Sequence, residues 1–195
     1  DHEEDAVGEA GLEARGRIGL AHGLEGLGGR GEIGGIVLLD EVDDDLAVRR
    51  AAYSAARRLI RTIPQCAHSV IDPLVSVLID GGAAAPLRVR AAVSLGELRD
   101  RRVVRGLVAG VTLREEEVAA ACQDALLLVV RQDPMRHGST WPDWYRRHGQ
   151  RSRIEWLIDA LMEDELPLRD AAATELKELT DTHFGYYATQ PRGER

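Results

Sequence analysis

Aromatic side chains are scarce in this chain, making up 4% of its 195 residues. Alanine, leucine, valine and arginine dominate instead. Strands favour aromatic and β-branched residues, so this composition argues against a β-sandwich and favours closely packed helices with small faces. We therefore expect an all-α fold.

Cysteine is also rare, and no metal-binding pattern is present. Cys66 and Cys122 do not form a CxxC pair, and each lies in an apolar helical context, where a free thiol acts as a small hydrophobic group. The histidines show no HExxH motif and no cluster with cysteine. We expect no metal and no cofactor, and the unpaired cysteines favour a reducing, cytoplasmic setting.

Long apolar runs and nucleotide motifs are missing as well. No run approaches the roughly 20 apolar residues that cross a bilayer, and the first five residues do not resemble a signal peptide. The segment Gly26–Gly31 lacks the preceding strand and the Lys-Ser/Thr of a phosphate-binding loop. We expect neither membrane insertion nor catalysis. A net charge of -8 argues against nucleic acid as the partner.

What the sequence does contain is an internal repeat. Four segments, beginning at Val48, Leu87, Val118 and Leu168, carry large apolar residues at their first, ninth and twelfth positions and a small residue at the fifth. This is helical spacing. A second apolar column, at 33–37, 71–75, 104–108 and 154–158, precedes each segment by 14 to 16 residues. Each unit is therefore predicted to be a helix, a short turn and a second helix.

Such pairs bury their apolar stripes only by stacking on one another, which predicts an α-solenoid, or superhelix, of four to five helix pairs with one longer insert. The predicted units are about 33–62, 67–99, 101–131 and 150–180, with the insert at 133–149 and an aromatic tail at 181–195. Asp72-Pro73 is expected to start a helix, and Gly81-Gly82 to end one. Residues 1–32 form either a degenerate glycine-rich repeat or a partly disordered arm, because 11 of the 20 glycines precede residue 36.

The pattern Leu87-Arg88, Ala91-Ala92, Leu95-Gly96-Glu97-Leu98 resembles bacterial HEAT repeats, as does the Ile-x-x-Leu-Val column upstream. Segments around Trp141-Pro142-Asp143-Trp144 and Leu179–Tyr186 are similar to segments that punctuate some HEAT-repeat proteins of unknown function. The resemblance covers about 33 to 180 and implies a concave or edge surface that holds protein partners. It does not by itself fix a function.

The insert holds the strongest candidate binding residues. Thr140 and Asp143 have the spacing of a capping box, which predicts a short helix over 141–148. From 131 to 153 there are six arginines against two aspartates. In one interpretation the indoles pack into a notch and the arginines are solvated or paired. In the other, the insert binds a protein or a nucleic acid through these residues: Trp141, Trp144, Tyr145, Arg146, Arg147 and Arg136.

The acidic runs also have two interpretations. Negative charge near a helix N-terminus is stabilised by free amides and the helix dipole, which explains the runs without a partner. Alternatively, they line one edge of the solenoid and bind a basic segment. The residues of this candidate acidic edge are Asp43, Asp44, Asp45, Glu115, Glu116 and Glu117.

Together these patterns predict a non-catalytic scaffold or adaptor for an unidentified protein partner, with a second copy of the chain as one option and a larger assembly as another. The alternative is a HEAT-like enzyme, of bilin lyase or DNA glycosylase type, or a nucleic-acid binder that uses the insert. The tail aromatics, Phe184, Tyr186 and Tyr187, either cover the last repeat or dock on another subunit.

Overall fold

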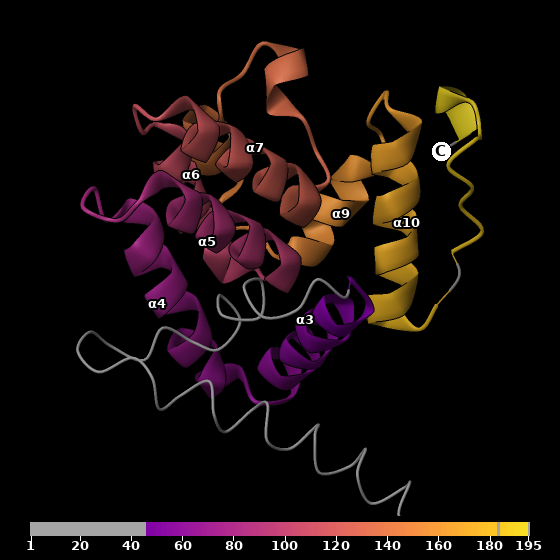
Figure 1. Cartoon of the computed structure of the whole chain (residues 1–195). Coiled ribbons are helices and arrows are strands. Elements are labelled where there is room, and N and C mark those ends of the chain that lie inside the picture. Colours follow the sequence, from indigo (N-terminus) through magenta and orange to yellow (C-terminus); the bar gives the residue numbers. More distant parts are fainter. Residues whose placement is uncertain (1–45, 183, 195) are drawn as a thin grey trace, which may run out of the picture.

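Helices account for the regular structure of this protein wherever its computed structural model describes the chain, at residues 46–182 and 184–194 (Figure 1). No strand occurs in these two ranges. Four short 3-10 turns connect or follow the helices, at Pro64–Cys66, Arg101–Val103, Pro134–His137 and Arg192–Glu194. The α-helices are α3 (Leu46–Thr62), α4 (Ala67–Ile79), α5 (Ala85–Leu98), α6 (Val104–Val111), α7 (Glu116–Val130), α8 (Trp141–His148), α9 (Arg153–Ala160) and α10 (Leu166–Thr180).

The repeat pattern places these helices correctly. The four aligned segments lie in α3, α5, α7 and α10, and the upstream columns at 71–75, 104–108 and 154–158 lie in α4, α6 and α9. The expected all-α class is confirmed for the described residues. The column at 33–37, the arm at 1–32 and the run Asp43–Asp45 lie outside them.

The expected helix start at Asp72-Pro73 is wrong, because α4 begins at Ala67 and Pro73 lies inside it. A proline there removes one backbone hydrogen bond of the helix. Ala67 and Ile71, in the turns before Pro73, are almost completely buried. Their burial favours continuing the helix through the proline. The helix ends at Ile79, just before Gly81-Gly82, as expected.

The helices pack in two ways. Consecutive helices contact each other as α4 with α5, α6 with α7 and α9 with α10, and across these pairs α5 lies on α7 and α4 on α6. The approach of α5 to α7 is close, since a Cβ atom on Gly96 would lie 2.8 Å from the Cβ of Ala125. One apolar core runs from Ile60 on α3 to Trp156 on α9, and a smaller one joins α9 to α10.

In two different units, an arginine at the same repeat position stabilises a turn through hydrogen bonds. Arg88, the second residue of its segment, donates from Nε to the carbonyl of Leu78 at 3.0 Å and from Nη1 to Glu115 at 2.9 Å. Arg169 holds the same place in α10, and its Nη1 donates to the carbonyls of Glu163 and Asp164 at 2.7 Å each. Both guanidinium groups are buried and satisfy carbonyl oxygens that the helices leave unpaired.

The C-terminal tail lies along α9 and α10. The Tyr186 hydroxyl donates to the carbonyl of Leu161 at 2.8 Å, and Ala188 is buried, with its carbonyl accepting from Arg169 Nε at 3.0 Å. Phe184 and Tyr187 remain exposed. The tail thus covers part of the last helix pair through Tyr186 and Ala188, and it borders an apolar hollow of 610 Å³.

The two cysteines differ in their surroundings. Cys122 is fully buried, and this burial raises the pKa of its thiol to about 12, which keeps the sulfur protonated and unreactive. Cys66 is half-buried, and neither is in a disulfide. The expected role of Cys122 as a small core residue is confirmed.

The fit between Gly110 and Cys122 gives a stability prediction. A Cβ atom on Gly110 would lie 2.3 Å from the Cys122 sulfur, so Gly110→Ala should lower the free energy of unfolding by about 1–3 kcal/mol through overpacking. Adding Cys122→Ala removes that sulfur. The double variant should regain most of the loss in urea denaturation, because the remaining neighbours lie at 3.3 Å or more. Additive losses in the double variant would contradict this explanation.

No helix within the described ranges is long and apolar enough to span a membrane.

Candidate binding groove

The insert folds as its capping residues predict, but its indoles are buried. Helix α8 covers Trp141–His148, and the Thr140 hydroxyl accepts a hydrogen bond from the backbone amide of Asp143 at 3.2 Å. Trp141 and Trp144 are only 2% and 3% exposed and contact each other edge to face. The two indole rings therefore belong to the core and present no face to a partner.

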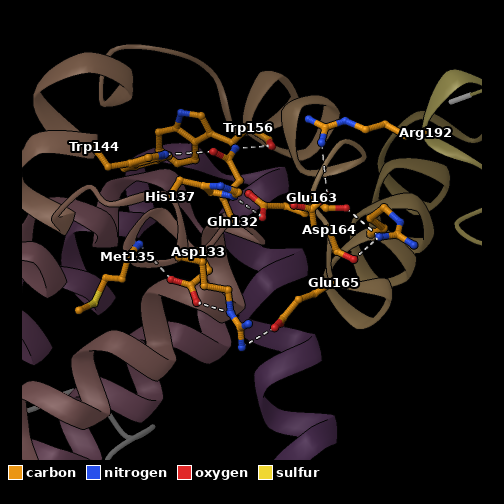
Figure 2. A network of polar contacts seen from close by, with 12 residues as sticks. Gln132, Asp133, Met135, His137, Trp144, Trp156, Glu163, Asp164, Glu165 and Arg192 are labelled. Carbon is orange, nitrogen blue, oxygen red and sulfur yellow. Dashed lines mark hydrogen bonds and ion pairs between the residues drawn. The ribbon is translucent and has the colours of Figure 1, made fainter.

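Gln132 fixes this arrangement by bridging two helices (Figure 2). Its side-chain oxygen accepts from Trp144 Nε1 at 3.0 Å, and its nitrogen donates to the carbonyl of Trp156 at 2.7 Å. Trp156 is itself fully buried and contacts Trp144 edge to face. The enlarged interval between repeats is thus filled by an aromatic cluster that joins α8 to α9.

Polar residues before α8 bind the acidic turn between α9 and α10, as Figure 2 shows. His137 Nε2 lies 3.1 Å from a Glu163 carboxylate oxygen, and Arg136 pairs with Asp133 and with Glu165. Glu163 and Glu165 of the acidic turn at 163–165 therefore have partners within the molecule.

The remaining candidate residues of the insert lie apart from one another. The Arg146 guanidinium pairs with Asp143 at 2.6 Å on the exposed surface, and Arg147 donates to the Asp143 carbonyl and to Ser139. Tyr145 is half-buried and lines a surface hollow on another side of α8. The structure thus does not bring these side chains together into one patch.

The candidate acidic edge is described only at 115–117. Glu116 and Glu117 are exposed in the first turn of α7, as the sequence predicts. Glu115 pairs with Arg88, and hydrogen bonds from its own backbone amide and from Arg88 hold its pKa below the ordinary value. This carboxylate has a partner within the chain.

A strongly charged groove, which the sequence did not single out, lies elsewhere on the described part of the chain. This groove of 760 Å³ lies between the second half of α3, the turn after α5, the start of α9 and the end of α10. We call it the arginine groove. Helices α3 and α10, distant in sequence, both contribute residues to its lining. Its seven basic side chains, against the three carboxylates of Asp100, Glu175 and Glu178, are Arg57, Arg58, Arg61, Arg99, Arg101, Arg102 and Arg153.

A second hollow continues the arginine groove. It shares Pro64 and the residues 100–102 with the groove and adds His68, Asp72, Arg105 and Tyr145. The arginines therefore continue from α3 past the turn after α5 to Arg105 on α6, and Asp72 adds one carboxylate to this part. Such a continuous track suits an extended chain with negative charges.

Some of these arginines are fixed and others are free. Arg102 binds both carboxylate oxygens of Asp100, at 2.8 and 2.7 Å, and donates to the Pro64 carbonyl at 2.8 Å. Burial of Asp100 opposes its ionisation, but the hydrogen bonds from Arg102 outweigh it and lower the Asp100 pKa. By contrast, the side chains of four exposed arginines form no hydrogen bond or ion pair with any described residue, namely Arg58, Arg61, Arg101 and Arg105.

At the floor of the arginine groove, three arginines surround one glutamate. Glu175 Oε1 accepts from Arg99 at 3.1 Å and from Arg131 at 2.8 and 2.5 Å, and Oε2 contacts Arg153. We call these four residues the Glu175 cluster. Burial of the Glu175 carboxyl opposes ionisation, but attraction to Arg153 and Arg131 outweighs it and holds its pKa below the ordinary value. Burial also lowers the pKa of Arg153.

Sequence reasoning missed this cluster because its members are 22 to 76 residues apart. One compositional signal was available. Lys177 is the only lysine among 25 basic residues, so the chain uses arginine almost exclusively. Arginine is the residue that binds carboxylate and phosphate in a two-pronged geometry.

Within the described ranges, no group of three or more His, Cys, Asp or Glu side chains is placed to hold a metal ion. Comparisons with protein-family models, with curated proteins and with solved structures found no match to this chain.

Proposed function

We propose that this chain is a HEAT-like α-solenoid that serves as a non-catalytic protein-binding scaffold, and that the arginine groove receives an acidic segment of its partner. The observation that carries the proposal is the excess of guanidinium groups over carboxylates in a concave surface of a protein whose net charge is -8. The two free cysteines fit a cytoplasmic location.

Two repeated features support the solenoid. First helices contact first helices, and second helices contact second helices, as in α4 with α6 and α5 with α7. In addition, α5, α7 and α10 each end at a residue in the left-handed conformation, with φ of 50°, 60° and 51° at Arg99, Arg131 and Asp181. Equivalent contacts and equivalent helix ends are what stacked repeats of one unit produce.

Two features favour an acidic peptide over nucleic acid. Among the described residues, only Tyr145 and His68 supply an aromatic ring to either hollow, and both line the second one, which leaves little surface on which bases could stack. The chain as a whole also carries net negative charge, which weakens attraction to a polyanion at long range.

The first test is binding of a fluorescent glutamate-rich peptide, followed by anisotropy at low and at physiological salt. We expect binding that weakens as salt rises. A triple variant reverses the charge of the three free arginines that line the arginine groove, as Arg58→Glu, Arg61→Glu and Arg101→Glu. It should weaken peptide binding by at least about tenfold, because charge complementarity is lost. These side chains are exposed, so the variant should fold normally.

Arg146→Glu is the matched control, because Arg146 is an exposed arginine outside the arginine groove. It should leave peptide affinity unchanged. If Arg146→Glu weakens binding as much as the groove variant does, the insert is the binding surface and the groove is not. Tighter binding of single-stranded DNA than of the peptide would replace the proposal with a nucleic-acid function, and no binding to either would remove it.

A further inference from the structure

The Glu175 cluster has an unbalanced charge. One carboxylate faces three guanidinium groups, and the side chains of Arg131 and Arg153 are each only 13% exposed. Charges held away from water are normally neutralised by partners close by. Here one negative charge leaves two positive charges without a counter-ion in the cluster.

The hydrogen-bonding capacity of the cluster is likewise not used up. The Nε atom of Arg99 is buried and has no hydrogen-bond partner. Arg57 lies beside the cluster on α3, where its Nη1 donates to the Glu97 carbonyl at 3.0 Å and lies 3.6 Å from the Glu97 carboxylate. Burial, followed by repulsion from Arg99, lowers the pKa of Arg57, which shows that the two cations lie within electrostatic reach of each other.

Two of these arginines reach the cluster from helix ends. Arg99 and Arg131 end α5 and α7 in the left-handed conformation, which glycine adopts at no steric cost and other residues adopt with strain. Both strained positions direct a guanidinium to the same carboxylate.

From these contacts we infer that the Glu175 cluster is a binding site for a phosphate monoester, carried as phosphoserine or phosphothreonine on the acidic segment that the arginine groove receives. The inference rests on the proposed function and adds the chemical identity of the anchoring group. A phosphate monoester carries about -1.5 to -2 charges near neutral pH, which matches the two positive charges that Glu175 leaves unbalanced. A second carboxylate would balance only one of them.

The position of the cluster fits this role. Arg99, Arg153 and Glu175 line the arginine groove, so their guanidinium groups are reached from the same surface as the free arginines. Arg131 does not line the groove and holds Glu175 from behind. A phosphate oxygen would be bound by Arg99, Arg153 and Arg57, with the free arginines contacting the acidic residues on either side.

The test compares three peptides that are identical except for one central residue, which is serine, glutamate or phosphoserine. On the wild-type chain, isothermal titration should give the order phosphoserine, then glutamate, then serine, with phosphoserine at least about tenfold tighter than glutamate because of paired guanidinium contacts. Free inorganic phosphate should compete only at concentrations far above the dissociation constant of the phosphopeptide.

Two variants separate selectivity from general attraction. Arg99→Gly suits the left-handed backbone and leaves Glu175 with Arg131 and Arg153, so the fold should persist while the preference for phosphoserine over glutamate disappears. Arg61→Gln, the control, removes a free arginine elsewhere in the groove. It should weaken both peptides equally and keep the preference.

Equal affinity of the wild-type chain for the phosphoserine and glutamate peptides would overturn this inference while leaving the proposed function intact. If none of the three peptides binds, the proposed function itself fails. If inorganic phosphate binds as tightly as the phosphopeptide, the site takes free phosphate and the assignment to a modified partner is overturned.

Discussion

Replacement of Glu175 by leucine is expected to lower the free energy of unfolding by about 3–5 kcal/mol, because it leaves buried arginines without their counter-charge. Glu175 is 6% exposed at its side chain and accepts hydrogen bonds from Arg99 and Arg131. The loss is measured by urea denaturation. Glu175→Gln retains the shape of the side chain and should give an intermediate loss.

Glu178→Leu provides the control for this prediction. Glu178 lies one turn further along α10 and also lines the arginine groove, but it is exposed. Its replacement should change stability by no more than about 0.5 kcal/mol. Similar losses at positions 175 and 178 would mean that the general charge of α10 matters and the Glu175 cluster does not.

The same carboxylate predicts the direction of a pH effect. The folded-state pKa of Glu175 is lowered from an ordinary value of 4.5, so its contribution to stability is complete above that pH. As the pH falls below 4.5 and through the lowered pKa, the carboxylate takes up a proton and this contribution is lost. The difference in stability between wild type and Glu175→Gln should therefore shrink on acidification.

The second large effect is expected at Arg169, where methionine should cost about 3 kcal/mol or more. Three carbonyl oxygens accept from this buried guanidinium, those of Glu163 and Ala188 in buried contacts and that of Asp164 in a part-buried one, and each buried acceptor left unpaired costs about 1–3 kcal/mol. Because Ala188 belongs to the tail, the variant should also release residues 184–194 from α10. Hydrogen exchange of the tail amides measures that release, and urea denaturation measures the stability.

Arg192→Met is the matched control for Arg169. Arg192 also links the tail to the turn before α10, through an ion pair with Asp164 at 3.5 Å, but both side chains are 70% exposed. Exposed pairs contribute about 0–1 kcal/mol, so this variant should retain the stability of the wild type. Unchanged exchange of the tail amides in Arg169→Met would show that the tail is held by other contacts.

The sequence alone determined the helices, because helix formation depends on spacing that is local to each segment. Apolar residues at helical intervals located α3, α5, α7 and α10, and the Thr140–Asp143 pair located α8 with its correct ends. The sequence left open whether Trp141 and Trp144 are buried or exposed, since an indole beside arginines suits a core or a binding surface equally well. Gln132 and Trp156, which settle their burial, lie in the loop after α7 and on α9.

Only the tertiary structure decided where the charges meet. Arg99 and Arg131 end two helices, Arg153 begins a third, and Glu175 lies within a fourth, so no local pattern relates them. Packing brings these helix ends together and removes their side chains from water, where electrostatic interactions become strong. The same packing keeps α4 helical across Pro73, although proline disfavours the interior of a helix. Segment-by-segment periodicity specified the helices, and long-range contacts specified the arginine groove.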